Sequence, residues 1–131
     1  MSARLPESIR PALEAGIPSM LVTCSAAGVP NATLISQVYW VDPEHVALSF
    51  QFFSKTVRNV RENPHAALGI IDYDRQCHWL LQVDYSHSET EGPVFEAMDM
   101  QIEAIASATG MAGIFKLKAA DIYRVRAVRE I

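Results

Sequence analysis

The feature that most limits the possible folds is an abrupt change of pattern within residues 46–64. Residues 46–53 alternate between two faces, which predicts a half-buried strand. Ser54 then begins a helix-like run that ends at Asn63-Pro64, and its hydroxyl can cap the first turn. First-turn N–H groups have no intrahelical partners, so the amides beside Lys55 and Thr56 form a phosphate-sized anion site. A strand that feeds directly into a helix therefore predicts a place for a phosphate group.

Two interpretations of this corner remain open from these residues alone. In the first, Ser54 is only a helix cap and Lys55 only a solvated charge, since capped helix starts are common and few bind a ligand. In the second, the preceding strand adds Ser49 and Gln51 as hydrogen-bonding groups for the edge of a planar ring. A phosphorylated planar cofactor needs both a polar strand edge and a helix start, so we favour the second interpretation.

The rest of the chain predicts short strands and two further helices. Turn signals separate residues 17–24, 31–41 and 45–53, which predicts three strands joined as an antiparallel meander. Pro93 starts a helix with one apolar stripe, and Gly110 ends it. The predicted helices cover 5–15, 55–63 and 93–110, and the other predicted strands cover 65–73, 77–86, 114–117 and 121–128. Six or seven short strands with a few helices indicate a mainly β protein, a small β-barrel with α-helices plugging its ends.

Length and composition limit the class of protein. At 131 residues the chain is most simply one domain, and half of its residues are hydrophobic, which argues against disorder. Its formal net charge of −4 argues against nucleic-acid binding, which requires a basic face. No run of about 18 apolar residues could cross a membrane, and the N-terminus lacks the pattern of a secretory signal. We therefore expect a cytoplasmic protein with a small-molecule substrate and with neither nucleic acid nor membrane as a partner.

The charged residues are distributed unevenly. Residues 84–103 contain six acids and neither Lys nor Arg, whereas the tail from Ala112 is mostly basic. These segments could pair within one chain, pair across a dimer, or form two separate solvated faces.

Neither the cysteines nor the histidines predict a metal centre. Cys24 and Cys77 are far apart in the sequence and lie in apolar runs, so we expect free thiols. The four histidines lack the spacing of metal ligands, and we expect no metal held by protein ligands alone. His65 or His78 could be the axial ligand of a haem, although a structural histidine is the more common case. No Gly-x-Ser-x-Gly motif is present, a Ser/His/Asp triad stays open, and no catalytic residue is identified.

The order of the elements and one motif resemble a known family. Three strands lead into S-K-T-x-x-N-x-x-x-N-P at residues 54–64, an apolar strand follows from Ala66, and IFKLKAADIYRVRAV at residues 114–128 closes the chain. This pattern resembles the pyridoxamine 5′-phosphate oxidase-like split-barrel family from about Leu13 to the end. The resemblance implies a six- to seven-stranded antiparallel split barrel that forms a homodimer, with FMN bound in clefts at the subunit interface.

The resemblance also assigns cofactor contacts to ten residues. The second strand would line the flavin ring, the end of the third strand would meet the edge of the ring, and the helix start would hold the phosphate. In chain order these residues are Thr33, Leu34, Ile35, Ser36, Ser49, Phe50, Gln51, Ser54, Lys55 and Thr56. Trp79 and Gln82 lie on the strand that, in the family, reaches the partner's cofactor.

This chain departs from the family's true oxidases in two ways. They carry an arginine where this chain has Thr33, and Arg58 or Arg61 could replace it. The chain is also shorter, and the residues that hold their substrate's phosphate are not found, so oxidation of pyridoxamine phosphate is not the first expectation. We expect an FMN-binding protein, an FMN-dependent oxidoreductase that acts on an unknown small molecule. The alternatives are a non-catalytic flavin- or haem-binding sensor or carrier, a deazaflavin in place of FMN, and a dimeric scaffold without a cofactor.

Overall fold

The computed structural model describes residues 3–15, 17–35, 37–50, 54–108 and 117–131. Within these ranges a short 3-10 helix, three α-helices and seven strands follow one another along the chain. In chain order they are η1 (Glu7–Ile9), α1 (Arg10–Glu14), β1 (Ser19–Cys24), β2 (Pro30–Ile35), β3 (Val38–Asp42), β4 (His45–Phe50), α2 (Ser54–Glu62), β5 (His65–Asp72), β6 (Cys77–Glu89), α3 (Pro93–Ala108) and β7 (Ala119–Glu130).

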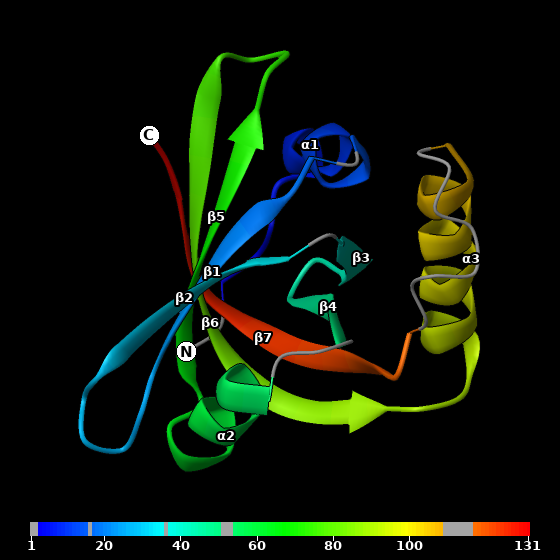
Figure 1. Cartoon of the computed structure of the whole chain (residues 1–131). Coiled ribbons are helices and arrows are strands. Elements are labelled where there is room, and N and C mark those ends of the chain that lie inside the picture. Colours follow the sequence, from blue (N-terminus) through cyan, green and yellow to red (C-terminus); the bar gives the residue numbers. More distant parts are fainter. Residues whose placement is uncertain (1–2, 16, 36, 51–53, 109–116) are drawn as a thin grey trace.

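All seven strands belong to one antiparallel sheet in the order β2-β1-β5-β6-β7-β4-β3 (Figure 1). The edge strands are β2 and β3, although the chain passes directly from one to the other. Residues 36 and 37 alone separate Ile35 from Val38, which limits the distance between these two residues to about 11 Å. The sheet therefore curls until its two edges approach each other, and the result is a barrel that is split between β2 and β3.

Two expectations about the strands need correction. Residues 31–41 form two strands rather than one, and β2 pairs with β1 while β3 pairs with β4. The predicted three-strand meander is therefore wrong, because the break at residues 36–37 carries the chain from one edge of the sheet to the other. The last two predicted strands are a single strand, β7, and residues 114–116 lie outside the described residues.

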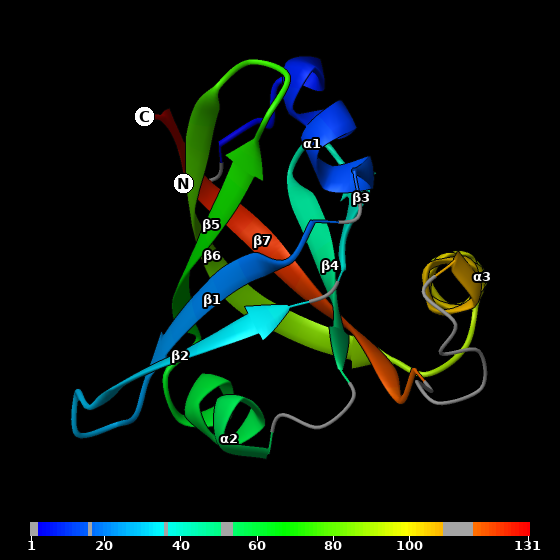
Figure 2. The same cartoon turned by 45° about the horizontal axis from the view of Figure 1, so that its top comes forward.

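Helices close both ends of the barrel, as the sequence predicted. α1 begins at Arg10 with Pro11 in its first turn, where a missing N–H is harmless. α1 contacts β3 and β5 at one end, and α2 contacts β1 and β2 at the opposite end (Figure 2). α3 begins at Pro93, as predicted, and lies beside the barrel against β7 (Figure 1).

Two apolar clusters hold these elements together. The barrel interior is filled by fully buried side chains, each of which contributes roughly 1.5–3 kcal/mol, and the largest include Leu21, Ile35, Leu68, Ile70, Leu81 and Tyr123. In the second cluster, Met98 and Ile102 of α3 pack on Ala47, Ala120 and Ile122. The outer face of β4 and β7 is thus covered by α3. Across the barrel, Met20 of β1 and Leu34 of β2 are 42% and 59% exposed.

The acidic and basic segments meet within the chain at one carboxylate. Asp84 of β6 lies 2.7 Å from Arg126 Nε and 3.7 Å from Arg124 Nη2, both on β7. His65 Nδ1 contacts the same carboxylate at 2.5 Å. Of the arrangements that the charge pattern left open, pairing within one chain is present here.

Two other expectations concern thiols and membranes. Cys24 and Cys77 are both free and partly buried, as predicted. Among the helices described, none combines the length and apolar character needed to cross a bilayer.

Candidate functional site

Side-chain hydrogen bonds fix α2 to the first hairpin. Asn59 is 4% exposed, and its Nδ2 donates to Thr23 Oγ1 at 3.1 Å. One turn earlier, Thr56 Oγ1 accepts a 3.5 Å hydrogen bond from Asn31 Nδ2 of β2. Because both contacts come from the buried side of α2, they set where the helix begins relative to β2. The sequence motif thus includes residues that position the helix as well as residues that could bind a ligand.

The structure describes only part of the predicted anion site at the start of α2. α2 begins at Ser54, as predicted, and the N–H groups of its first turn have no intrahelical partners. Thr56 is only 6% exposed and its hydroxyl is turned toward Asn31, so its backbone N–H is the group it offers an anion. The side chains of Ser54 and Lys55 lie outside the described residues.

The two arginines that could replace the missing family arginine differ in position. Burial raises the pKa of the Asp121 carboxyl, and the positive charge of Arg61 opposes that rise. Arg61 is therefore associated with β7, at the far end of α2 from Ser54. Arg58 lies one turn from Ser54 on an exposed side of the helix, which makes Arg58 the better placed substitute.

The predicted ring-lining segment on β2 alternates between two faces. Leu34 is 59% exposed, whereas Ile35 is 1% exposed and belongs to the barrel core. Ile35 can therefore meet a ligand only through its backbone, while Leu34 and the half-buried Thr33 can offer side chains. β2 is also an edge strand, which leaves backbone N–H and C=O groups facing the split. Ser36 lies outside the described residues.

The predicted segment on β4 is more enclosed. β4 pairs with both β3 and β7, so its backbone groups are used in the sheet. Ser49 is 2% exposed, and its Oγ has no hydrogen-bond partner among the described residues. The side chain of Phe50 and the whole of Gln51 lie outside the described residues.

Chain connectivity brings these three segments to one end of the split. β2 leads through the passage at 36–37 into β3, β3 pairs with β4, and β4 leads into α2. The hydrogen bond between Asn31 and Thr56 then connects α2 to β2. Figure 2 shows the end of β4, the strand β2 and the helix α2 gathered at the same end of the barrel.

Gln37 also lies in this region, although it is not one of the predicted site residues. Gln37 is 5% exposed, and its Nε2 donates to Met98 O at 3.3 Å and to Gln101 Oε1 at 2.6 Å, both on α3. The available signal was a polar residue inside an otherwise apolar run. Gln37 joins the end of the predicted ring-lining segment to α3.

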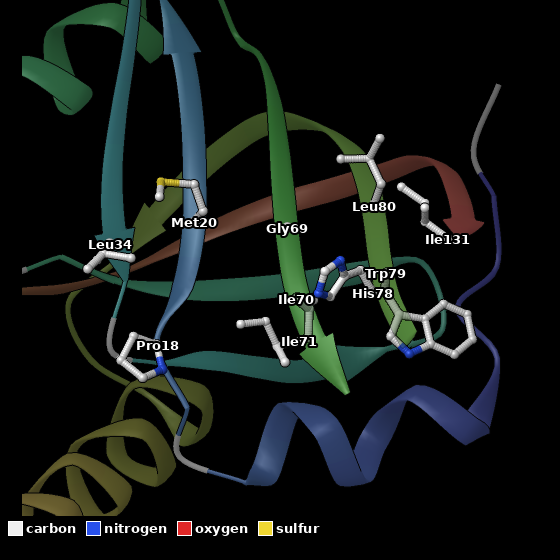
Figure 3. A pocket seen from close by; sticks show the side chains of 10 residues that line it. All are labelled: Pro18, Met20, Leu34, Gly69, Ile70, Ile71, His78, Trp79, Leu80 and Ile131. Atoms are coloured by element: carbon white, nitrogen blue, oxygen red, sulfur yellow. The ribbon is translucent and has the colours of Figure 1, made fainter. Parts of the chain in front are cut away.

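An apolar groove of about 330 Å³ lies on the outer face of β1, β2, β5 and β6 (Figure 3). Gly69 lies in the middle, between Met20 and Leu80. A Cβ on Gly69 would meet Met20 O at 3.9 Å, which is an ordinary contact. Packing within the chain therefore does not require glycine, although glycine weakens a strand interior. The groove therefore has room for a side chain at position 69.

The residues expected to reach a partner's cofactor do not share one face. Trp79 is 4% exposed, and its Nε1 donates to Asp72 Oδ2 at 3.0 Å, so its polar atom is already used inside the chain. Gln82 is exposed and lies opposite Ala67 on the groove side of the sheet. Trp79 nevertheless lines part of the apolar groove, and Gln82 has the more exposed side chain of the two.

The two histidines considered for haem also differ. His65 contacts Asp84, whereas His78 is exposed and lines the apolar groove. No group of three potential metal ligands occurs in the described part of the chain. His78 is thus the better placed axial candidate.

A buried acid lies near the end of α2. Asp121 is 9% exposed, and Ser88 Oγ donates to its Oδ1 at 2.6 Å. Tyr85 OH lies 2.6 Å from the same Ser88 Oγ. Burial raises the pKa of the Asp121 carboxyl above its usual value, while the Ser88 hydrogen bond and the charge of Arg61 oppose that rise.

Asp121→Asn is expected to gain stability relative to the parent as the pH rises. The folded-state pKa is raised, so the folded protein binds more protons than the unfolded chain between the unfolded pKa, about 3.9, and the raised value. The stability of the parent therefore falls as the pH rises through this window, and the asparagine variant does not share that fall. Urea unfolding at pH 4 and pH 7 measures the difference. The exposed Asp74→Asn variant is the control. The prediction is contradicted if the stability of Asp121→Asn relative to the parent is no larger at pH 7 than at pH 4.

Comparison with known proteins decides the family. The family model described as pyridoxamine 5′-phosphate oxidase matches residues 5–126. The chain belongs to the pyridoxamine 5′-phosphate oxidase family. No functionally curated protein matches this family member in sequence.

Solved structures share the fold of this pyridoxamine 5′-phosphate oxidase family member at low identity. An FMN-binding protein from Syntrophomonas wolfei subsp. wolfei superposes with a TM-score of 0.80 and 16% identity, over 95% of this chain and 84% of that chain. An F420 reductase superposes with a TM-score of 0.67 and 15% identity, over 95% of this chain and 98% of that chain. HutZ, a heme storage protein from Vibrio cholerae, superposes with a TM-score of 0.62 and 15% identity, over 96% of this chain and 94% of that chain. At these identities the likeness shows a common split-barrel fold, and the cofactor of this chain is a separate question.

Proposed function

We propose that the protein binds FMN and is an oxidoreductase that acts on an unknown small molecule. The observation that carries the proposal is the convergence of the β2 edge, the end of β4 and the start of α2 at one end of the split. A helix start suits a phosphate, and a strand edge with free backbone groups suits the polar rim of a flat ring. When bound, FMN supplies the redox chemistry, and the protein supplies binding, orientation and shielding from water.

Each part of the chain has a separate task in this proposal. The first-turn amides of α2 with Lys55 hold the phosphate, and Arg58 adds a second positive charge nearby. Thr33 and Leu34 of β2 support the ring. Asn59 and Thr56 do not need to touch the cofactor, since their hydrogen bonds hold α2 in place.

The proposed active form is a homodimer in which the groove face of one subunit packs on that of a second copy. This face is apolar, with Met20 and Leu34 exposed, and Gly69 at its centre permits close approach. Gln82 lies on the same side and would reach the partner's cofactor. The unpaired thiols of Cys24 and Cys77 accord with a reducing compartment, and we place the protein in the cytoplasm.

A visible absorption spectrum of the protein as purified tests the proposal. The two bands of an oxidised flavin support FMN, and a protein that stays colourless after incubation with FMN contradicts the proposal. Anaerobic addition of NADH or NADPH then distinguishes an enzyme from a sensor. Bleaching of the flavin within seconds supports turnover, and an unchanged spectrum with every electron donor tried favours a carrier.

Haem binding is the second candidate, and the position of His78 favours it. His78 lines an open apolar groove, a setting that suits an axial ligand beside a hydrophobic macrocycle. If haem is the cofactor, hemin should give a Soret band that shifts or disappears in His78→Ala. His65→Ala is the matched control, because His65 contacts Asp84 outside the groove. A Soret band that is identical in both variants and the parent would exclude His78 as the ligand.

A further inference from the structure

A polar cleft of about 190 Å³ lies between α1, β3 and α3. Figures 1 and 2 both show β3 between these two helices, and among the described strands β4 is its one neighbour. None of the residues that line the cleft is among the ten predicted cofactor contacts. Pockets for drug-sized ligands measure roughly 300–1,000 Å³, so this cleft suits a smaller molecule. The residues that define its chemistry are Arg10, Leu13, Glu14, Val38, Trp40 and Gln101.

Two opposite charges of α1 line this cleft without pairing with each other. Arg10 and Glu14 are one helical turn apart, a spacing at which opposite charges can pair. Arg10 Nη1 instead lies 3.5 Å from Glu7 Oε2, and no described residue forms an ion pair with Glu14. The Glu7 contact is long and exposed, and exposed pairs of this kind contribute at most about 1 kcal/mol. A small molecule that carries one charge of each sign would satisfy both side chains.

Arg10 is held in a position that suits a carboxylate. Its guanidinium carbon lies 4.9 Å from the centroid of the Trp40 ring, on the β3 wall of the cleft. Stacking on an aromatic face fixes the guanidinium and leaves its N–H groups free to donate at the edge. Two parallel N–H groups match the two oxygens of a carboxylate.

Gln101 adds a donor from the α3 wall. Gln37 Nε2 donates to Met98 O at 3.3 Å and to Gln101 Oε1 at 2.6 Å. Met98 O is a backbone acceptor, so the amide nitrogen of Gln37 has to face it, and the oxygen of Gln101 has to face that nitrogen. The NH₂ group of Gln101 is therefore the end of the amide that can donate to a ligand in the cleft.

We propose that this cleft binds a free α-amino acid with a small apolar side chain. Arg10 and Gln101 donate to its carboxylate, and Glu14 accepts from its ammonium group. The apolar side chain lies on Leu13 and Val38, which form the apolar part of the wall. The site does not rest on the proposed function, because α1 closes the end of the barrel opposite α2 (Figure 2).

Isothermal titration calorimetry of the full chain with L-valine tests the site. Two analogues each lack one charge of L-valine, since 3-methylbutanoate has no ammonium and isobutylamine has no carboxylate. Each analogue is expected to bind at least about tenfold more weakly than L-valine, because each loses charge-assisted hydrogen bonds.

Variants assign each charge of the ligand to its partner. Arg10→Gln should remove most of the advantage of L-valine over isobutylamine, and Glu14→Gln should remove most of its advantage over 3-methylbutanoate. Glu7→Gln is the matched control, since it removes the ion-pair partner of Arg10 and does not line the cleft. This control should bind L-valine at least as tightly as the parent. Melting temperatures of the three variants report whether the fold is intact.

Several outcomes would overturn the site. A parent protein that does not bind L-valine does so, as do equal affinities for L-valine and its two analogues. A loss of L-valine affinity in Glu7→Gln as large as that in Arg10→Gln would show a general effect of charge on α1, and it also overturns the site. Arg10 packs on Trp40, so Arg10→Gln can lower the melting temperature. Glu14 is exposed, and an unchanged preference for L-valine over 3-methylbutanoate in Glu14→Gln is then decisive against the site.

Discussion

Replacing Lys55 by alanine is expected to weaken FMN binding roughly ten- to hundredfold and to leave riboflavin binding unchanged. A charge-assisted hydrogen bond to a phosphate contributes about 1.5–3 kcal/mol, and about 1.4 kcal/mol corresponds to a tenfold change in Kd. Riboflavin has no phosphate, so its affinity reports the ring alone. Isothermal titration calorimetry with both ligands measures the two effects.

The control for Lys55→Ala is Lys118→Ala, which removes the same charge from an exposed position just before β7. Circular dichroism of both variants checks that the barrel is intact. Equal FMN affinities in the parent and the Lys55 variant would move the phosphate site away from the start of α2. A parallel loss of riboflavin affinity would show that the substitution disturbs the whole site.

Replacing Gly69 by leucine is expected to convert the proposed dimer into a monomer and to weaken FMN binding by more than about a hundredfold. The added side chain fits within one chain, because its Cβ meets Met20 O at 3.9 Å and the face beyond is open. It would occupy the space that the second subunit's backbone needs. A cofactor held between two subunits then loses one wall of its cleft. Light scattering after size-exclusion chromatography measures the mass, and calorimetry measures the affinity.

Two further variants make the Gly69 experiment specific. Gly69→Ala should have a dimer fraction and an FMN affinity between those of the parent and the leucine variant, because its smaller side chain holds the second subunit less far away. Glu103→Leu adds the same apolar surface on an exposed side of α3 and should remain dimeric. A parent protein that is monomeric in solution, or a leucine variant that stays dimeric with full FMN affinity, contradicts the proposed interface.

The corner between β4 and α2 could be predicted because its signals are local. Alternation from Val46 describes a strand, and Ser54 followed by helix-forming residues describes a helix start, where the structure places it. The start of α3 at Pro93 was predictable for the same reason. Signals of this kind act within a few residues and do not depend on distant partners.

Strand pairing could not be predicted because it is decided by residues far apart in the sequence. Residues 31–41 alternate well enough for one strand, and no local pattern shows that Ile35 and Val38 belong to opposite edges of the sheet. The polar Gln37 marked the break, but its meaning depends on hydrogen bonds to α3, more than sixty residues later.

The candidate site could be predicted as a set of segments and not as a set of side chains. Residues 33–36 were assigned together, yet the pleat turns Ile35 into the core and leaves Leu34 59% exposed. Likewise, a family match on one strand could not show that Trp79 donates a hydrogen bond to Asp72 while the side chain of Gln82 is exposed.

The two-residue connection between Ile35 and Val38 limits the width of the split in the barrel. The connection joins the two edge strands β2 and β3, so the maximum width of the split depends on how many residues the connection contains. One inserted residue would add up to about 3.6 Å of reach and would also turn every later side chain of β3 to the opposite face. Two inserted residues would widen the split between β2 and β3 and leave each side chain of β3 on its present face. Insertions of two residues would therefore let this fold bind a thicker ligand in the split.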